Sequence, residues 1–228
     1  MKKIVVLSGA GMSAESGILT FRDNGGLWQN HSIQEVATPY AWIKNPQLVM
    51  DFYNQRRKQL LEVKPNVAHY ALAKLEGKYD VHIVTQNVDD LHERAGSTKV
   101  LHLHGELRKV RSEKDTSLIY ELDGWELKLG DLAEDGAQLR PHIVWFGEDV
   151  PKMGNATDIV READILIVVG TSLSVYPAAG LLNETKIGCR RIYIDPQAHS
   201  QYLEGVERIS EKASIGVANI VDELYVED

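Results

Sequence analysis

Residues 3–14 read Lys-Ile-Val-Val-Leu-Ser-Gly-Ala-Gly-Met-Ser-Ala, and this stretch decides the fold. The first six residues form a β-branched apolar run that ends at glycine, which is typical of a buried parallel strand. The glycines at positions 9 and 11 match the G-x-G-x-x-[GA] pattern of a turn that leads into a helix and lets the backbone approach a pyrophosphate. The pattern predicts a strand over residues 3–8 and a dinucleotide-binding turn after it, with a tight turn that binds no ligand as the alternative.

Three further runs resemble this strand, at residues 81–85, 165–170 and 191–195. Each is followed by a polar or glycine turn and a helix-compatible stretch, and this alternation predicts an α/β fold with a Rossmann-like, doubly wound parallel sheet. Ligands of such sheets bind at the carboxyl ends of the strands. The turns at those ends are small or polar: Gly-Ala-Gly-Met-Ser, Gln-Asn-Val-Asp-Asp and Gly-Thr-Ser.

Two stretches, residues 32–76 and residues 106–140, do not fit the sheet. The first has a helical spacing of apolar residues, and Asn45-Pro46 suits a helix cap and first helical position. The second is charged and irregular, with a short hairpin-like piece near residues 118–125. We interpret both as insertions that form a small lobe on a single domain spanning residues 1–228.

The composition is ordinary for a soluble globular protein, with 43% hydrophobic and 25% charged residues. No apolar run approaches the roughly 20 residues that span a bilayer, and the N-terminal apolar run stops at Ser8 without a cleavage site, so we expect a cytoplasmic protein and no membrane. A net charge of -8 argues against nucleic acid and favours cationic partners. Cys189 is the only cysteine, which excludes an internal disulfide and a cysteine-rich zinc site.

Two polar constellations follow the predicted strands. In Thr85-Gln86-Asn87-Val88-Asp89 the polar side chains should project into the crevice of the glycine turn, where amides can bond a carboxamide and hydroxyls; helix capping is the alternative. In His102-Leu103-His104-Gly105 the two histidines alternate along an extended segment, so only one faces the crevice. Histidine suits proton transfer near neutral pH. A structural role is the alternative, and we set a metal aside because no cysteine or carboxylate pattern accompanies the pair.

The loop after the glycine turn departs from an ordinary Rossmann unit. No second strand that ends in an acidic residue appears about 20 residues later. Instead, a long loop with Phe21, Arg22 and Trp28 follows. This loop suits closure over a cofactor.

Together these motifs resemble the sirtuin family. The family's Gly-Ala-Gly-x-Ser loop corresponds to residues 9–13, its Thr-Gln-Asn-x-Asp turn to residues 85–89, its His-Gly to residues 104–105 and its Gly-Thr-Ser turn to residues 170–172. Their order and spacing agree from residue 4 to about residue 215. The resemblance implies an NAD-dependent deacylase that acts on acylated lysine in proteins or peptides, with His104 as the catalytic base.

The resemblance also implies the other site residues. On the NAD side they are Gly9, Ala10, Gly11, Ser13, Glu15, Phe21, Arg22, Gln86, Asn87, Asp89, Gly170, Thr171, Ser172, Asp195 and Ala213. On the substrate side, residues 139–148, with Val144, Phe146 and Gly147, resemble the strand and loop along which the peptide lies as an added strand, and residues 174–176 flank its other side.

One departure from the family is plain. Most sirtuins carry four zinc-binding cysteines between the His-Gly and a later Arg-Pro-His, and residues 106–139 contain none. We therefore expect no metal, as in a zinc-site-lacking form of the family. We expect packing to hold the small lobe, through Leu118, Tyr120, Leu122, Trp125 and Leu127.

A Tyr-x-x-Arg motif concerns the acyl group. Tyr53 and Arg56 share one helix face, so a phenol and a guanidinium can jointly bind a carboxylate. The motif resembles the signature of the desuccinylase and demalonylase subclass, and Ala37 resembles the small residue that widens its acyl pocket. A surface tyrosine packed on an arginine stem is the alternative, and we expect Arg57, about 100° further around the helix, to be solvated.

By the same resemblance, the reaction removes succinyl, malonyl or acetyl groups and yields free lysine, nicotinamide and O-acyl-ADP-ribose. Two other functions stay open. NAD glycohydrolysis or ADP-ribosyl transfer would use the same cofactor chemistry with another acceptor, and an NAD-sensing module would bind without turnover.

Overall fold

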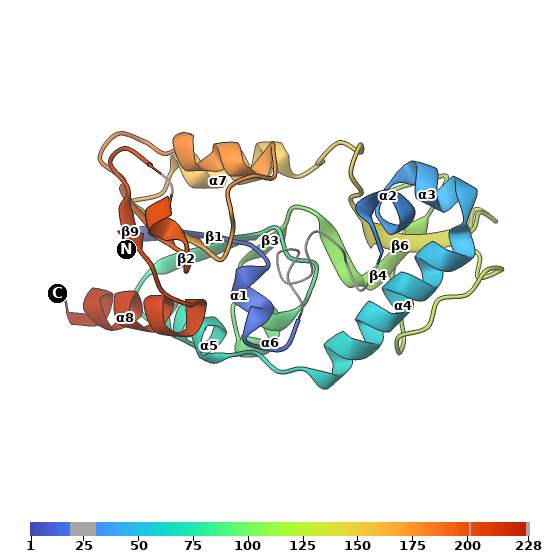
Figure 1. Ribbon diagram of the computed structural model, residues 1–228, viewed down its shortest axis with the longest axis horizontal. Helices are drawn as coiled ribbons and strands as arrows, with labels where there is room; N and C mark the ends of the chain where they lie inside the picture. The colour runs from blue at the N-terminus through green and yellow to red at the C-terminus, as the bar shows by residue number, and fades with distance from the viewer. Residues whose placement is uncertain (19–30, 201, 227–228) are drawn as a thin grey trace.

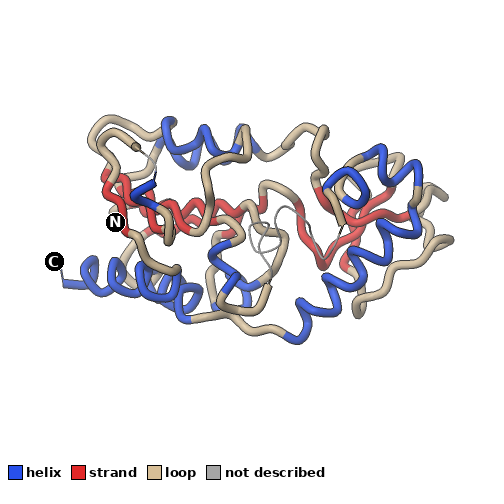
Figure 2. Tube along the Cα trace, viewed as in Figure 1, coloured by secondary structure: helices blue, strands red, loops and turns tan. Residues whose placement is uncertain are grey.

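The computed structural model describes residues 1–18, 31–200 and 202–226, which form two lobes (Figure 1). A six-stranded sheet lies in the larger lobe and a three-stranded sheet in the smaller one, as the strands in Figure 2 show. Phe21, Arg22 and Trp28 lie outside the described residues. Across the described ranges, none of the helices is long and apolar enough to cross a membrane.

The larger sheet is entirely parallel and has the order β3-β2-β1-β7-β8-β9. Its strands are β1 (Lys3–Ser8), β2 (Asp80–Thr85), β3 (Val100–His102), β7 (Ile165–Val169), β8 (Arg190–Ile194) and β9 (Glu207–Ile209). The strand order reverses direction between β1 and β7, so the predicted doubly wound fold is confirmed. The short edge strands β3 and β9 were not predicted, because three residues show no hydrophobic period.

Helices cover both faces of this sheet. Ile4 and Val6 of β1 pack with α5 (Val67–Leu75) and α8 (Ala213–Val226). The alternate residues, Val5 and Leu7, pack with α7 (Met153–Arg161) and the 3-10 helix η1 (Ala178–Asn183). Figure 1 shows α7 above the sheet and α5 and α8 below it. Burial on both faces is the reason why β1 is apolar at every position from Ile4 to Leu7.

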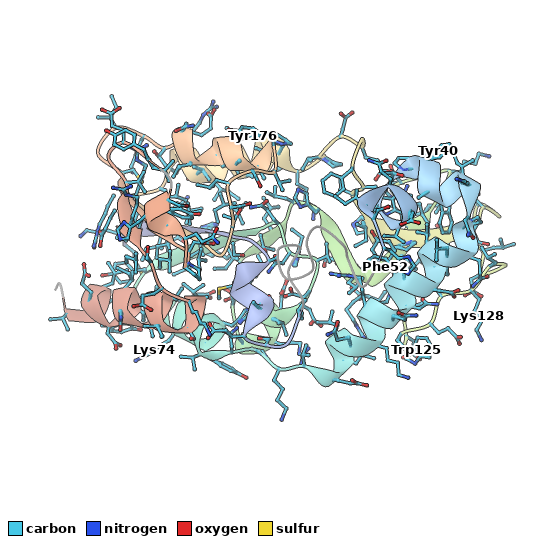
Figure 3. The ribbon with its side chains drawn as sticks, viewed as in Figure 1. Tyr40, Phe52, Lys74, Trp125, Lys128 and Tyr176 are labelled. Atoms are coloured by element: carbon cyan, nitrogen blue, oxygen red, sulfur yellow. The ribbon has the colours of Figure 1, made fainter. Side chains whose placement is uncertain are left out.

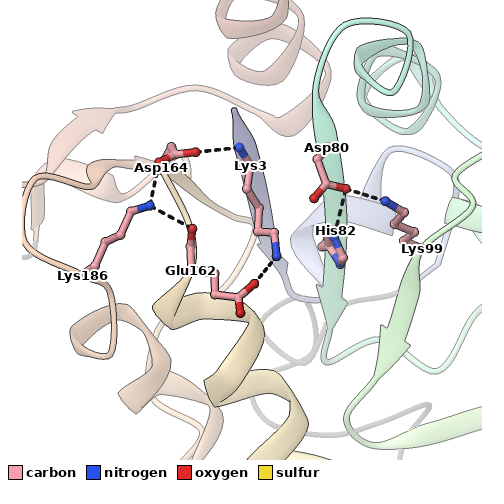
Figure 4. A network of polar contacts seen from close by, with 7 residues as sticks. All are labelled: Lys3, Asp80, His82, Lys99, Glu162, Asp164 and Lys186. Atoms are coloured by element: carbon pink, nitrogen blue, oxygen red, sulfur yellow. Dashed lines mark hydrogen bonds and ion pairs between the residues drawn. The ribbon is translucent and has the colours of Figure 1, made fainter. Parts of the chain in front are cut away.

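The connecting helices are short. They are α1 (Gly11–Ala14) after β1, α6 (Leu91–Ala95) between β2 and β3, and the 3-10 helix η2 (Ala198–Ser200) after β8. At the amino edge of the sheet, the network in Figure 4 joins strand ends: Asp164 accepts hydrogen bonds from the Lys3 amide at 2.8 Å and from Lys186 Nζ at 2.7 Å. Asp80 is paired with His82 and Lys99 at the same edge. The carboxyl edge is therefore the one left for a ligand.

The small lobe combines three helices with an antiparallel sheet of order β5-β4-β6. Its elements are α2 (Ile33–Val36), α3 (Pro39–Lys44), α4 (Pro46–Glu62), β4 (Gly105–Ser112), β5 (Ile119–Glu121) and β6 (Leu139–Ile143). Asn45 caps α4 by accepting a hydrogen bond from the Leu48 amide at 3.1 Å, with proline at the first helical position. The predicted start of this helix is confirmed.

The first insertion is shorter than the predicted 32–76. Ala68, Leu72 and Leu75 of α5 pack in the core of the larger sheet, so this helix belongs to the larger lobe. The second insertion extends beyond residue 140, because β6 continues to Ile143. Helical spacing predicts that α5 is a helix, but it does not reveal which apolar surface the helix covers.

Packing in the small lobe follows the prediction only in part. Leu127 is buried, and Tyr120 and Leu122 pack against the same cluster. Leu118 is only half-buried and lies outside that cluster, and Trp125 is 36% exposed at the outer side of α4 (Figure 3). Within the part of the chain that the structure describes, no group of three or more His, Cys, Asp or Glu side chains could hold a metal ion.

Arg57 corrects the expectation of a solvated side chain. It is fully buried, and it donates from Nε to the Leu107 carbonyl and from Nη1 to the Trp125 carbonyl, both at 2.9 Å. Asn54, one helical turn earlier, exchanges two hydrogen bonds with the backbone of Leu127. Helix α4 thus holds the irregular segment through polar contacts that a hydrophobic pattern does not reveal.

Candidate active site

The carboxyl ends of the central strands open into a cavity of about 1030 Å³ whose walls come from both lobes. Every predicted site residue within the described ranges lines this cavity. They are Gly9, Ala10, Gly11, Ser13, Glu15, Ala37, Tyr53, Arg56, Gln86, Asn87, Asp89, His104, Val144, Phe146, Gly147, Gly170, Thr171, Ser172, Asp195 and Ala213.

Two turns meet backbone to backbone at the point where the strand order reverses. The Gly9 amide donates to the Val169 carbonyl at 3.0 Å, and the Gly11 amide donates to the Gly170 carbonyl at 2.8 Å. A Cβ atom on Gly11 would lie 2.7 Å from the Gly170 Cα. Only glycine permits this approach, which leaves bare backbone on the cavity wall, as a bound pyrophosphate requires.

Helix α1 is one turn long, which differs from the expected helix behind a pyrophosphate. Its dipole is therefore small, and charge stabilisation there depends on individual backbone amides. Glu15, just after it, accepts hydrogen bonds from the Ser214 amide at 3.0 Å and from Ser214 Oγ at 2.8 Å. This carboxylate caps α8 and ties the glycine turn to the far end of the chain.

The polar turn after β2 is a closed hydrogen-bond network. Asn87 Nδ2 donates to Ser13 Oγ at 3.1 Å, and Ser13 Oγ donates to Asp89 Oδ2 at 2.9 Å. Asp89 Oδ1 also accepts from the amide of Leu91, the first residue of α6, whereas the N-cap position of that helix is Asp90 and makes no side-chain cap. Burial raises the pKa of Asp89, and the bonds from Ser13 and Leu91 act against that rise.

His104 is oriented by the same turn. Its Nδ1 lies 3.1 Å from the Gln86 carbonyl oxygen. Because a carbonyl only accepts, Nδ1 carries the proton, and Nε2 keeps its lone pair as a base. Burial lowers the pKa of His104 below 6.5, although the Gln86 bond partly opposes this shift. The imidazole is therefore neutral at pH 7, which is the form that can accept a proton.

His102 points away from the cavity, which confirms that only one of the two histidines faces it. Its side chain is buried between the Asn87 carbonyl and Glu93.

The small-lobe wall carries the Tyr-x-x-Arg pair. The Tyr53 hydroxyl accepts a hydrogen bond from Trp145 Nε1 at 3.0 Å, and burial raises the pKa of Tyr53 to about 12. Arg56 is 8% exposed and lines the cavity from the same helix face. Ala37 is buried beside them, and its carbonyl accepts from the Phe146 amide at 3.0 Å. A cation and a phenol thus lie on one largely desolvated wall.

Two hydrogen bonds from backbone amides fix the segment after β6. The amide of Val144 donates to the His104 carbonyl at 2.9 Å, and the amide of Trp145 donates to Glu148 Oε2 at 2.8 Å. Arg140 holds Glu148 in turn at 2.7 Å. Tyr176, which also lines the cavity, is 75% exposed, and Figure 3 shows its place beside α7.

Sequence reasoning missed several lining residues. They are mainly apolar side chains and a lysine, among them Ile18, Ile33, Leu60, Leu107 and Lys212. The apolar residues carry no sequence signal of such a role, because cavity walls and cores use the same side chains.

Comparisons with known proteins agree with this geometry. The sequence model described as the Sir2 family matches residues 9–177. A protein of Helicobacter pylori strain J99, named NAD-dependent protein deacylase, is 59% identical over 227 residues, covering 98% of this chain and 96% of the relative. A protein of Bacteroides thetaiotaomicron with the same name is 57% identical over 202 residues, covering 86% of each chain.

Solved structures are similar over the same length. A complex of a Sir2 homologue with NAD has a TM-score of 0.87 and 39% identity, and the match covers 98% of this chain and 90% of the other. A Sir2 variant with a deacetylated p53 peptide and 3'-O-acetyl-ADP-ribose has a TM-score of 0.80 and 29% identity, covering 96% and 92% of the two chains. By sequence and by structure over nearly its whole length, the chain belongs to the Sir2 family of NAD-dependent protein deacylases.

Proposed function

We propose that the chain moves acyl groups from protein lysine onto the ADP-ribose part of NAD, and that it prefers acidic acyl groups such as succinyl and malonyl. Arg56 is the observation that carries the preference. It is a cation 8% exposed on the cavity wall, one helical turn from the Tyr53 phenol. A guanidinium can donate two parallel hydrogen bonds to a carboxylate, and such a charge-assisted pair is strongest where water is excluded. An acidic acyl group ends in such a carboxylate, whereas an acetyl group has none.

The residues of the larger lobe suit NAD. NAD supplies a ribose carbon whose bond to a positively charged nicotinamide breaks readily. Asn87 and Asp89 offer hydrogen-bond partners to a carboxamide, and Gln86 offers one to a ribose hydroxyl. His104 accepts the proton of a ribose hydroxyl through Nε2, while the Gln86 carbonyl holds the ring in the required tautomer.

The substrate segment supports peptide deacylation over other uses of NAD. Residues 144–147 and residues 174–176 both line the cavity. β6 is an edge strand of the small sheet, so an extended peptide can be added beside its continuation. A similar Sir2 structure holds a deacetylated peptide and an acetyl-ADP-ribose. Mass spectrometry of the products distinguishes the functions: acyl-ADP-ribose indicates deacylation, free ADP-ribose glycohydrolysis, and intact NAD a sensor.

The test of acyl preference compares the wild type with Arg56→Met on acetyl-, malonyl- and succinyl-lysine peptides. Loss of one hydrogen-bonded charge pair removes about 1.5–3 kcal/mol, so we expect kcat/KM for succinyl-lysine to fall about 10- to 100-fold. Turnover of acetyl-lysine should stay within a few-fold of the wild type, because that substrate has no anion to lose.

Lys58→Met is the matched control. Lys58 lies on the same helix and is exposed over the Trp125 ring, so this variant removes the same charge without reaching the cavity. It should leave all three substrates unaffected. Unchanged succinyl-lysine turnover in Arg56→Met would overturn the acidic-acyl preference and leave the deacylase assignment intact.

A further inference from the structure

His102 has two fixed hydrogen bonds, although it does not line the cavity. It is the last residue of β3, which pairs with β2, and is 4% exposed. Its Nδ1 lies 3.0 Å from the Asn87 carbonyl oxygen, and its Nε2 lies 2.7 Å from Glu93 Oε1. Since a carbonyl only accepts, Nδ1 carries a proton. With a carboxylate at Nε2, both nitrogens face acceptors, which is the arrangement that suits an imidazolium.

The two histidines therefore hold consecutive carbonyls of one turn. His104 donates to the Gln86 carbonyl and His102 to the Asn87 carbonyl. The side chains of Gln86, Asn87 and Asp89 on that turn face the cavity. A displacement of the Asn87 carbonyl would also displace the neighbouring side chains that face the cavity, because the peptide units between them are rigid.

Charged and titratable groups surround His102 on several elements. Helix α6 supplies Glu93 and His92, strand β4 supplies Glu106, and the turn after β2 supplies Asp89. His69 of α5 packs edge-on against His92. Glu93 and Glu106 raise the pKa of His102 despite its burial, and the positive charge of His102 in turn opposes the raised pKa of Asp89.

We propose that His102 is a positioning residue for the NAD reaction: it fixes the turn of residues 86–89 through the Asn87 carbonyl, and it places a positive charge in the buried surroundings of that turn. The inference rests on the proposed role of this turn as the nicotinamide-side wall. It goes beyond the acyl preference, because it concerns NAD alone. Glu93 takes part by holding the proton on His102.

Two substitutions at His102 separate the anchor from the charge. The amide nitrogen of asparagine takes the place of Nδ1, so His102→Asn keeps a donor for the Asn87 carbonyl and loses the charge. The amide nitrogen of glutamine takes the place of Nε2, so His102→Gln leaves that buried carbonyl without its donor. A hydrogen bond to a charged donor carries a larger free energy than a neutral one.

The experiment is a calorimetric titration of each purified variant with NAD between pH 8 and pH 5.5. His102→Gln loses both the donor and the charge, so it should raise the Kd for NAD about tenfold at pH 8, the scale of one lost hydrogen bond from a charged group, and by more at lower pH. His102→Asn should bind NAD within about threefold of the wild type at pH 8, a loss on the scale of a weak neutral hydrogen bond. As the pH is lowered, the affinity of His102→Asn for NAD should begin to fall at a higher pH than the affinity of the wild type. The reason is that Asp89 takes up a proton more readily without the neighbouring positive charge.

A second measurement follows the imidazole of His102 by NMR, with His102→Asn identifying its signal. Glu93→Gln should lower the pKa of His102 relative to the wild type, because Glu93 is its principal acidic partner. Glu184→Gln is the matched control. It breaks an exposed pair with Arg161 and should change neither the NAD titration nor the histidine signal.

A purely structural role predicts a lower melting temperature and a loss of NAD affinity that is equal at all pH values in His102→Asn. That result, or wild-type affinity in both His102 variants, overturns the inference. If the wild type itself binds no NAD, the proposed function fails instead. The two failures are thus distinguishable.

Discussion

Gly105→Ala should inactivate the enzyme without touching a side chain of the cavity. Gly105 follows His104 and has a φ of +86°, a conformation in which a Cβ atom costs roughly 1–2 kcal/mol. The added Cβ would also lie 2.0 Å from the carbonyl oxygen of His142 on β6. Real Cβ atoms essentially never lie closer than 3.0 Å, so the two chains must separate there by at least 1.0 Å.

The displacement acts on His104 because the neighbouring backbone is tethered on both sides. The Val144 amide donates to the His104 carbonyl, and the imidazole donates to the Gln86 carbonyl. A shift of about 1 Å in a catalytic group reduces turnover about 100-fold. We therefore expect kcat to fall by about that factor, and the free energy of unfolding in urea to fall by about 2 kcal/mol or more from the backbone strain and the overlap.

Gly154→Ala is the control for this change. Gly154 lies in α7, and a Cβ atom there meets nothing within 4 Å. Alanine should keep full activity and stabilise the helix by about 0.5–1 kcal/mol. Wild-type turnover and stability in Gly105→Ala would show that the β4–β6 pairing does not position the base, and the reasoning would be refuted.

Two further predictions concern the histidines. His104→Ala should abolish deacylation and leave the Kd for NAD within about threefold, the scale of a weak neutral contact; retained turnover would exclude His104 as the base. Burial lowers the pKa of His69 to about 4, so the unfolded chain takes up a proton between pH 6.5 and 4 that the folded chain does not, and stability should fall by about 3 kcal/mol over that range. In urea titrations at several pH values, the free energy of unfolding of His69→Asn should fall less steeply with pH than that of the wild type. The same dependence on pH in both proteins would contradict this account.

The polar half of the site could be predicted from the sequence because its residues stand at strand ends. Gly9, Asn87 and Gly170 each follow a buried apolar run, and parallel strands bring their carboxyl ends together. His102 and His104 were separable because side chains alternate along an extended segment. In each case a local pattern, either an apolar strand or the alternation of side chains along it, determines where the side chain lies. The prediction therefore required no knowledge of long-range contacts.

The remaining features depend on contacts between distant segments. Arg57 is buried because two distant carbonyls accept its hydrogen bonds. They belong to Leu107 and Trp125, which lie 50 and 68 residues further along the chain. Helix α5 belongs to the larger lobe because it packs beside α8, which lies more than a hundred residues further along the chain. Neither packing partner can be recognised from a local sequence pattern. The predictions that Arg57 is solvated and that the first insertion spans residues 32–76 were therefore wrong.

His104 connects the two halves of the site. Its imidazole is oriented by the Gln86 carbonyl, on the turn proposed to bind nicotinamide, and its carbonyl accepts from Val144, at the start of the proposed peptide segment. One residue therefore sets the position of the base relative to both substrates. If the proposed acyl preference holds, a change at Arg56 on α4 should alter the choice of acyl group, whereas any change that moves residues 104–105 should alter both substrate positions together.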